Sequence, residues 1–153
     1  MAILSSVYFL VSMQIFASTV VGAIIGYGRE KNKKPAGIKT YALVCLGSCL
    51  VMIISKISTG DPMRLAAQVV SGIGFLCAGV IIVTKSSQII GLTTAAGLWF
   101  SACVGLAIGS DVYWIAIPAV LCYYLVTEVI SKVERKMGLE DHPRIIDDEI
   151  IES

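Results

Sequence analysis

The stretch from Leu92 to Ser131 decides the fold class. It reads LTTAAGLWFSACVGLAIG, then the two-residue link Ser110-Asp111, then VYWIAIPAVLCYYLVTEVIS. Both halves are mostly apolar, and a helix needs about 20 such residues to cross the hydrocarbon core of a bilayer. Because the link is so short, the two helices are expected to form a tight antiparallel pair. The stretch therefore predicts an integral membrane protein.

Three more segments of this kind precede the pair, namely Ile3–Tyr27, Thr40–Ile57 and Leu65–Thr84. Lipid offers the backbone no hydrogen-bond partners, so each segment must satisfy its own polar groups as a helix. The predicted fold class is an all-α integral membrane protein, a bundle of about five transmembrane helices. Residues 1–131 form the predicted transmembrane domain, and residues 132–153 form a short charged tail.

The composition fits a chain embedded in a lipid bilayer. Hydrophobic residues make up 56% of the 153 residues and charged residues 15%, against about 25% charged in soluble proteins. The mean hydropathy is +0.83. A net charge of +1 gives no reason to expect a nucleic-acid partner. The five cysteines lie within the apolar segments and the one histidine, His142, lies in the tail, so we expect no metal or cofactor.

The distribution of basic residues predicts the orientation. Lysine and arginine gather on the cytoplasmic side of membrane proteins. If the N-terminus is outside, ten of the twelve basic residues lie inside and only Lys56 and Arg64 lie outside. The inside set follows the first, third and fifth segments: Arg29, Lys31, Lys33, Lys34, Lys39, Lys85, Lys132, Arg135, Lys136 and Arg144. We therefore expect the N-terminus outside and the C-terminus in the cytoplasm.

Small residues spaced by four predict where the helices pack, since they let backbones approach closely in lipid. The fifth segment lacks such a ladder and carries Pro118, so we expect it at the periphery. In the third segment the expected inner face holds Ala67, Ser71, Gly74 and Ala78. The other predicted packing positions are Gly22 and Gly26 in the first segment, and Gly97, Ser101, Gly105 and Gly109 in the fourth.

A polar strip at the start of the third helix is one candidate functional site. Asp61, Arg64 and Gln68 share a helix face that we expect to lead inward. Ionisable groups near a span are costly and often functional. The alternative is local structure, with Asp61 as the N-cap, Pro62 at the first helical position and Arg64 reaching the headgroups.

The expected cytoplasmic side offers a second candidate site. Arg29 and Glu30 end the first segment, Lys39-Thr40 begins the second, and Thr93-Thr94 begins the fourth. Two helix starts near a basic loop are suited to accept an anion. The alternative roles are capping for the threonines and attraction to anionic lipid for the lysines. Since the sequence contains no catalytic signature, we expect a protein that is not an enzyme.

Three blocks of the sequence together resemble the transmembrane domain of the MgtC/SapB family. They are Arg29-Glu30 with Ala36-Gly37-Ile38-Lys39-Thr40; the long block from Asp61-Pro62-Met63-Arg64 through Gln68 to Ile81; and Gly91-Leu92-Thr93-Thr94-Ala95-Ala96-Gly97-Leu98-Trp99. The matching motif positions are Arg29, Glu30, Asp61, Arg64, Gln68 and Thr94. Lys39 and Cys77 depart from residues common in the family, and Thr93 and Phe100 stand where its virulence branch tends to have asparagine and cysteine.

The resemblance implies a multi-pass protein of the bacterial cytoplasmic membrane, in a family linked to growth under magnesium limitation and, in pathogens, to survival in host cells. We therefore expect a non-enzymatic regulatory or accessory protein for magnesium or envelope stress, acting as a homo-oligomer or within a larger membrane complex. The alternative is a small oligomeric transporter or channel for an ion or small solute, using Asp61, Arg64 and Gln68.

Overall fold

The computed structural model describes residues 2–83 and 89–137. This part of the chain contains five helices long and apolar enough to cross a membrane, which confirms the predicted all-α membrane fold. The helices are α1 (Ala2–Lys31), α2 (Ile38–Ile57), α3 (Pro62–Val80), α4 (Leu92–Gly109) and α5 (Tyr113–Tyr124). The fifth span continues through a π-helical turn (Leu125–Ile130) into α6 (Ser131–Lys136).

The C-terminal ends of the first and third helices differ from the prediction. The first helix runs to Lys31 rather than Tyr27, and its end is closed when the Lys34 amide donates to the Arg29 carbonyl at 3.0 Å. The third helix stops at Val80, before the predicted end, because the chain then enters a two-stranded antiparallel ladder. Its strands are β1 (Ile82–Val83) and β2 (Ile89–Ile90). Lys85 and residues 138–153 of the predicted tail lie outside the described residues.

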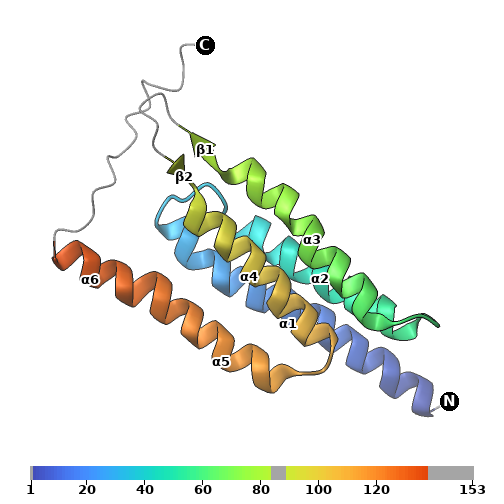
Figure 1. The fold of residues 1–153 in the computed structure, drawn as a ribbon. Coiled ribbons are helices and arrows are strands. Elements are labelled where there is room, and N and C mark those ends of the chain that lie inside the picture. Colours follow the sequence, from blue (N-terminus) through green and yellow to red (C-terminus); the bar gives the residue numbers. More distant parts are fainter. Residues whose placement is uncertain (1, 84–88, 138–153) are drawn as a thin grey trace.

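The fourth helix is the centre of the bundle. It packs against α1, α2, α3 and α5, and α1 and α2 also pack along each other. In Figure 1, α3 and α5 lie on opposite sides of this three-helix core. In the most apolar 18-residue stretch of each helix, 56% of the residues are buried in α4 but only 6% in α3. The described fold is therefore a core of α1, α2 and α4 with two peripheral helices.

Glycines set the spacing within this core. A Cβ atom at Gly22 would lie 2.7 Å from the Cβ of Cys45, and one at Gly105 would lie 2.9 Å from the Cβ of Ser48. At Gly26 and Gly109 the facing backbone of α2 is equally near. Since real Cβ atoms do not approach so closely, any side chain at these positions would push α2 away.

The inner face predicted for α3 is wrong. Ala67, Ser71, Gly74 and Ala78 are all exposed, and a Cβ atom at Gly74 would meet nothing within 4 Å. The buried residue of this helix is Ile73. Lipid is as apolar as a side chain, so a stripe of small residues does not by itself decide which face turns inward.

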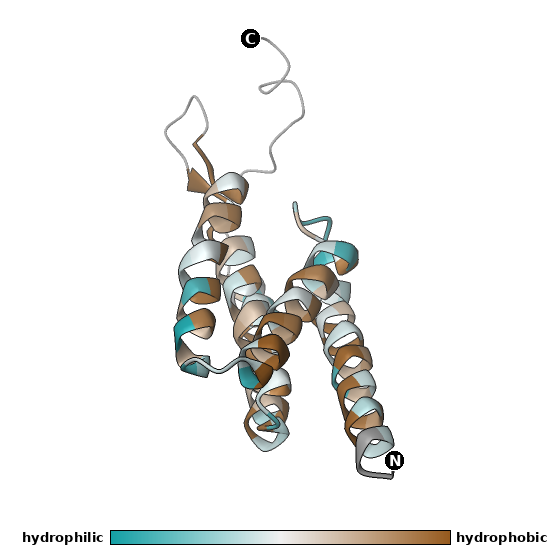
Figure 2. Ribbon diagram, turned by 90° about the vertical axis from the view of Figure 1, so that its right-hand side faces the viewer, coloured by the Kyte–Doolittle hydropathy of each residue, from teal (hydrophilic) through white to brown (hydrophobic). Residues whose placement is uncertain are grey.

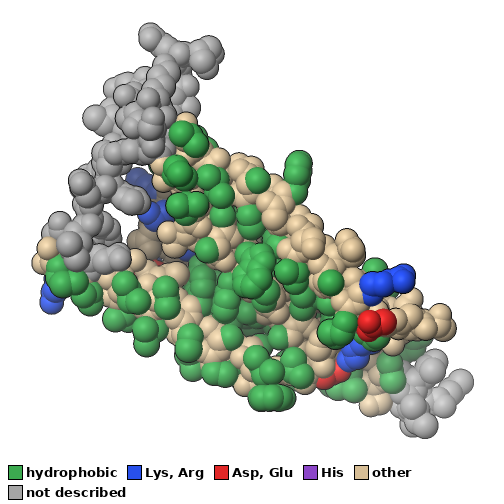
Figure 3. Space-filling model, viewed as in Figure 1, with side chains coloured by type: hydrophobic (Ala, Val, Ile, Leu, Met, Phe, Trp, Pro, Cys, Tyr) green, Lys and Arg blue, Asp and Glu red, His purple; other side chains and the backbone are tan. Residues whose placement is uncertain are grey.

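The surface of the bundle is that of a membrane protein. Hydrophobic residues run along the helices (Figure 2), and hydrophobic side chains cover the middle of the face seen in Figure 3. Charged side chains appear towards the ends of that face. Below, the basic end is the end that carries Arg29 and the α1–α2 loop, and the opposite end carries the α2–α3 and α4–α5 loops.

Candidate functional site

Arg29 is a buried cation in the last turn of α1. Only 7% of its surface is exposed. One terminal nitrogen, Nη2, donates to the Thr94 hydroxyl at 2.8 Å. A cation at the C-terminal end of a helix is favoured by the helix dipole. The structure thus brings together two predicted site residues that lie 65 positions apart in the sequence.

Tyr41 joins the second helix of the core to the same point. Its side chain is fully buried, and its hydroxyl donates to the Thr94 carbonyl at 3.3 Å. The Tyr41 carbonyl in turn accepts from the Ser101 hydroxyl at 3.0 Å. These bonds connect α2 to two points of α4 that lie about two turns apart, and Arg29 connects α1 to the first of these points. Thr94 is therefore the meeting point of the three core helices.

Gly97 makes room for the polar groups of this site. A Cβ atom there would lie 3.0 Å from the hydroxyl of Tyr123, and the Tyr41 hydroxyl is nearer still. The Tyr123 ring stacks on Phe100, with ring centroids 5.0 Å apart and an angle of 16° between the planes. We name Arg29, Tyr41, Thr94 and Tyr123 the Arg29 cluster. Gly97, predicted as a helix-packing position, faces these two tyrosines.

Two donors of the Arg29 cluster have no partner within the described residues. They are the Nε of Arg29 and the hydroxyl of Tyr123, both buried. No described carboxylate forms a salt bridge with Arg29. A buried guanidinium with adjacent hydroxyls is suited to hold an acceptor or an anionic group. The described residues contain no group of His, Cys, Asp and Glu able to hold a metal.

The other predicted residues at the basic end lie outside this cluster. Glu30 caps α2, because its carboxylate accepts from the Ile38 amide at 2.8 Å. Thr93 and Lys39 are exposed. A polar depression of about 390 Å³, here the lysine cup, opens beside Lys39. It is lined by Glu30, Lys33, Lys34, Gly37, Lys39 and Thr40. The two threonine helix starts therefore do not form one mouth, since Thr94 is buried and Thr40 lines this cup.

The strip of Asp61, Arg64 and Gln68 does not lead inward, and all three residues are exposed. Asp61 is the N-cap of α3, and its carboxylate accepts from the Met63 amide at 2.9 Å. The strip lies on a helix that contributes little to the core. The structure therefore provides the capping contact, and it places the strip on the outer surface of the bundle.

A second polar cluster, which the sequence analysis missed, closes the opposite end. Gln14 is 4% exposed, and its amide donates to the Ile108 carbonyl at 3.0 Å and to the Asp111 carboxylate at 2.7 Å. Lys56 forms a salt bridge with the other carboxylate oxygen of Asp111 and donates to the Gly109 carbonyl. Gln14, Lys56 and Asp111 form the Asp111 cluster, which satisfies the end of α4. A glutamine within the first apolar segment was the available signal.

The two clusters lie near opposite ends of the bundle. Along α1, Gln14 and Arg29 are fifteen residues apart, or about 22 Å at 1.5 Å per residue. That distance fits within a hydrocarbon core of about 30 Å. Each cluster ties α1, α2 and α4 together at one end of an apolar band.

In a comparison with known proteins, residues 15–136, most of the five-helix bundle, match the MgtC family. The chain belongs to the MgtC family. This member is 36% identical over 136 residues to Protein SapB of Bacillus subtilis, an alignment covering 82% of this chain and 59% of SapB. The predicted resemblance is thereby confirmed.

Two other relatives match most of this chain, and the name of one of them refers to magnesium. The Escherichia coli K12 protein named "Putative magnesium transporter YhiD" is 41% identical over 129 residues, which cover 78% of this chain and 59% of that protein. Protein MgtC of Salmonella typhimurium strain LT2 is 40% identical over 110 residues, covering 71% of this chain and 47% of MgtC. The MgtC family member described here thus spans about half to three fifths of these relatives. No solved structure matches the chain significantly.

Proposed function

We propose that this MgtC family member is a non-enzymatic regulatory or accessory protein of the bacterial cytoplasmic membrane, serving adaptation to magnesium limitation or envelope stress. The observation that carries the proposal is the closed core. Gly22, Gly105 and Gly109 bring α1 and α4 against α2 with no room for a Cβ atom. Thr94 and Asp111 engage the polar side chains at the two ends. Such a core is suited to present a fixed surface to a partner.

A transporter is the second candidate, and the name of the Escherichia coli relative favours it. In this reading the exposed Asp61, Arg64 and Gln68 of several copies line a path between protomers. Two findings weigh against a path through one protomer. Gln68 faces outward on α3, whereas Thr94 is buried between α1 and α4.

Transport is tested with the purified protein in lipid vesicles that contain a fluorescent magnesium indicator. The regulatory proposal predicts the same Mg²⁺ entry as in empty vesicles. Mg²⁺ entry that requires the protein and is abolished by Gln68→Ala would contradict the regulatory proposal and support transport.

The regulatory role is tested by growth of a deletion strain at low and high magnesium, with variants of Asp61 supplied on a plasmid. We expect a defect at low magnesium only, restored by the wild type. Asp61→Ala removes the N-cap and the charge, whereas Asp61→Asn keeps a good capping residue and removes only the charge. If the charge has a functional role, both variants fail to restore growth although the Asn variant is as abundant as the wild type. Rescue by Asn alone would reduce Asp61 to a helix cap, and growth unaffected by the deletion would contradict the magnesium link.

A further inference from the structure

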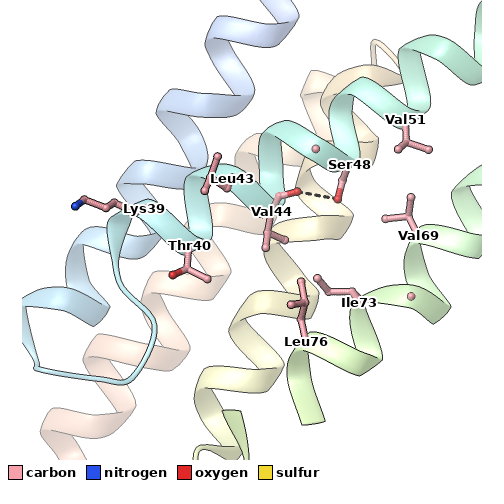
Figure 4. A pocket seen from close by; sticks show the side chains of 11 residues that line it. Lys39, Thr40, Leu43, Val44, Ser48, Val51, Val69, Ile73 and Leu76 are labelled. Carbon is pink, nitrogen blue, oxygen red and sulfur yellow. Dashed lines mark hydrogen bonds between the residues drawn. The ribbon is translucent and has the colours of Figure 1, made fainter. Parts of the chain in front are cut away.

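An apolar groove runs between α2 and α3 and opens at the surface of the bundle (Figure 4). Its volume is about 580 Å³. The floor contains the buried residues Ile73 and Ser48. The Ser48 hydroxyl donates a hydrogen bond to the Val44 carbonyl at 2.8 Å, so it is not free for another acceptor. The remaining walls are aliphatic side chains and two glycines, apart from Lys39 and Thr40 at one end. Because both helices are membrane spans, this groove faces the lipid.

The groove exists because α3 changes partner along its length. At the opposite end it is tied to α2, where the Ser55 hydroxyl donates to the Pro62 carbonyl at 2.9 Å. Near the basic end α3 packs against α4, where the Cys77 thiol donates to the Ala95 carbonyl at 3.2 Å. The gap from α2 is therefore closed at one end and open towards Lys39.

The open end of the groove continues into the lysine cup, because Lys39 and Thr40 line both. In Figure 4 the Lys39 ammonium lies beyond the aliphatic walls, on the side away from Leu76. The cup adds Lys33 and Lys34, while the Glu30 carboxylate is engaged by the Ile38 amide. Three lysines against one glutamate leave the cup positively charged.

The dimensions match one leaflet of a bilayer. The groove follows α2 from Lys39 to Val51, which is about 18 Å at 1.5 Å per residue. Half of the hydrocarbon core measures about 15 Å. An apolar slot of this depth below a cationic cup is complementary in shape and charge to a single phospholipid with an anionic headgroup.

We infer that the α2–α3 groove and the lysine cup form a binding site for one anionic phospholipid. An acyl chain lies along Val44, Gly47 and Gly72, and the headgroup phosphate lies at Lys33, Lys34 and Lys39. The expected cytoplasmic position of this end fits, because anionic lipids enrich that leaflet and attract basic residues.

Native mass spectrometry of the detergent-purified protein tests the site, with palmitoyl-oleoyl phosphatidylglycerol as the probe and the phosphatidylcholine analogue as the neutral comparison. Each lysine near an anionic headgroup is worth about fivefold in affinity, so the triple change of Lys33, Lys34 and Lys39 to Gln weakens phosphatidylglycerol binding on the order of a hundredfold. Lys31→Gln, at the same end but outside the cup, is the matched control and leaves the affinity within about twofold.

Two glycine variants test the acyl-chain slot without touching the charges that set membrane orientation. Gly72→Leu fills the groove, yet its Cβ atom meets nothing within 4 Å and leucine favours the helix, so the variant is expected to fold. It weakens binding of both lipids at least about tenfold. Gly74→Leu on the same helix, equally unhindered and outside the groove, binds as the wild type does. Circular dichroism checks the helical content of each variant.

Wild-type binding of phosphatidylglycerol by the triple lysine variant or by Gly72→Leu would overturn the lipid site. Gly72→Leu that binds lipid normally but loses a dimer seen for the wild type would assign the groove to a second copy of the chain instead.

Discussion

At the scale of the residue, Arg29 is the one charged side chain that is buried among the described residues. A buried cation without a carboxylate partner is held by hydrogen bonds and by the end of its own helix. Thr94 supplies the bond to its Nη2 atom, and its carbonyl also serves Tyr41. One threonine thus stabilises two polar side chains from two other helices.

Replacing Thr94 by valine keeps the shape of the side chain and removes the hydroxyl. We expect the free energy of unfolding to fall by about 1–2 kcal/mol, since hydrogen bonds to charged groups exceed the roughly 0.6 kcal/mol average between membrane helices. Unfolding in mixed detergent and SDS micelles, followed by circular dichroism, measures the change. Thr93→Val is the matched control, because Thr93 is the exposed neighbour. Equal stability of the two variants would show that the Arg29–Thr94 bond contributes nothing.

Sequence reasoning reached half of this cluster. Arg29 and Thr94 were singled out because polar groups at the ends of apolar segments are conspicuous. Tyr41 and Tyr123 were not, because a tyrosine within a hydrophobic run fits the core, the lipid face or the interface equally well. Which of these applies depends on how the helices are rotated, and rotation is set by contacts between helices.

At the scale of the element, glycine has opposite roles in α4 and α3. Gly105 of α4 meets Ser48 across a helix interface, whereas Gly72 and Gly74 of α3 meet nothing within 4 Å. Small residues spaced by four occur in both helices and predicted a packing face in each. Only in α4 does that face contact another helix. For α3 the same pattern pointed to the wrong face, because small residues permit a close approach of two helices but do not require one.

Alanine substitution separates the two roles. Gly105→Ala adds a methyl group 2.9 Å from the Cβ of Ser48, so we expect a loss of about 1–3 kcal/mol in the free energy of unfolding. Gly74→Ala adds the same methyl group to open space, and we expect a gain of up to about 1 kcal/mol from helix propensity. The SDS unfolding assay measures both. A destabilising Gly74→Ala would mean that this face of α3 is covered in the assembled protein.

At the scale of the whole molecule, the five spans and their order were predictable because about 20 apolar residues are needed to cross a bilayer. The Asp111 cluster was not, because it joins residues from three distant segments, namely Gln14, Lys56 and Asp111. No local pattern shows that a glutamine in one helix will meet the end of another.

The predicted orientation can be measured by labelling introduced cysteines with a maleimide that does not cross membranes. Gly60→Cys in the α2–α3 loop and Asn32→Cys in the α1–α2 loop replace exposed residues at opposite ends of the bundle. With the N-terminus outside, Gly60→Cys is labelled in intact spheroplasts and Asn32→Cys only after permeabilisation. The parent chain, whose cysteines lie within the spans, gives the background. The reverse pattern would invert the topology and place the lysine cup on the outer leaflet.

The bond between Arg29 and Thr94 also has a consequence for biogenesis. Sixty-five positions separate the two residues. At roughly 5–20 residues per second, the ribosome needs roughly 3–13 s to extend the chain from Arg29 to Thr94. During that interval α2 and α3 are synthesised, and the guanidinium of Arg29 has no Thr94 to bind. Its flexible stem lets the charge reach the aqueous interface in the meantime. The arrival of α4 then draws Arg29 inward, so this bond forms only after the fourth span has been synthesised.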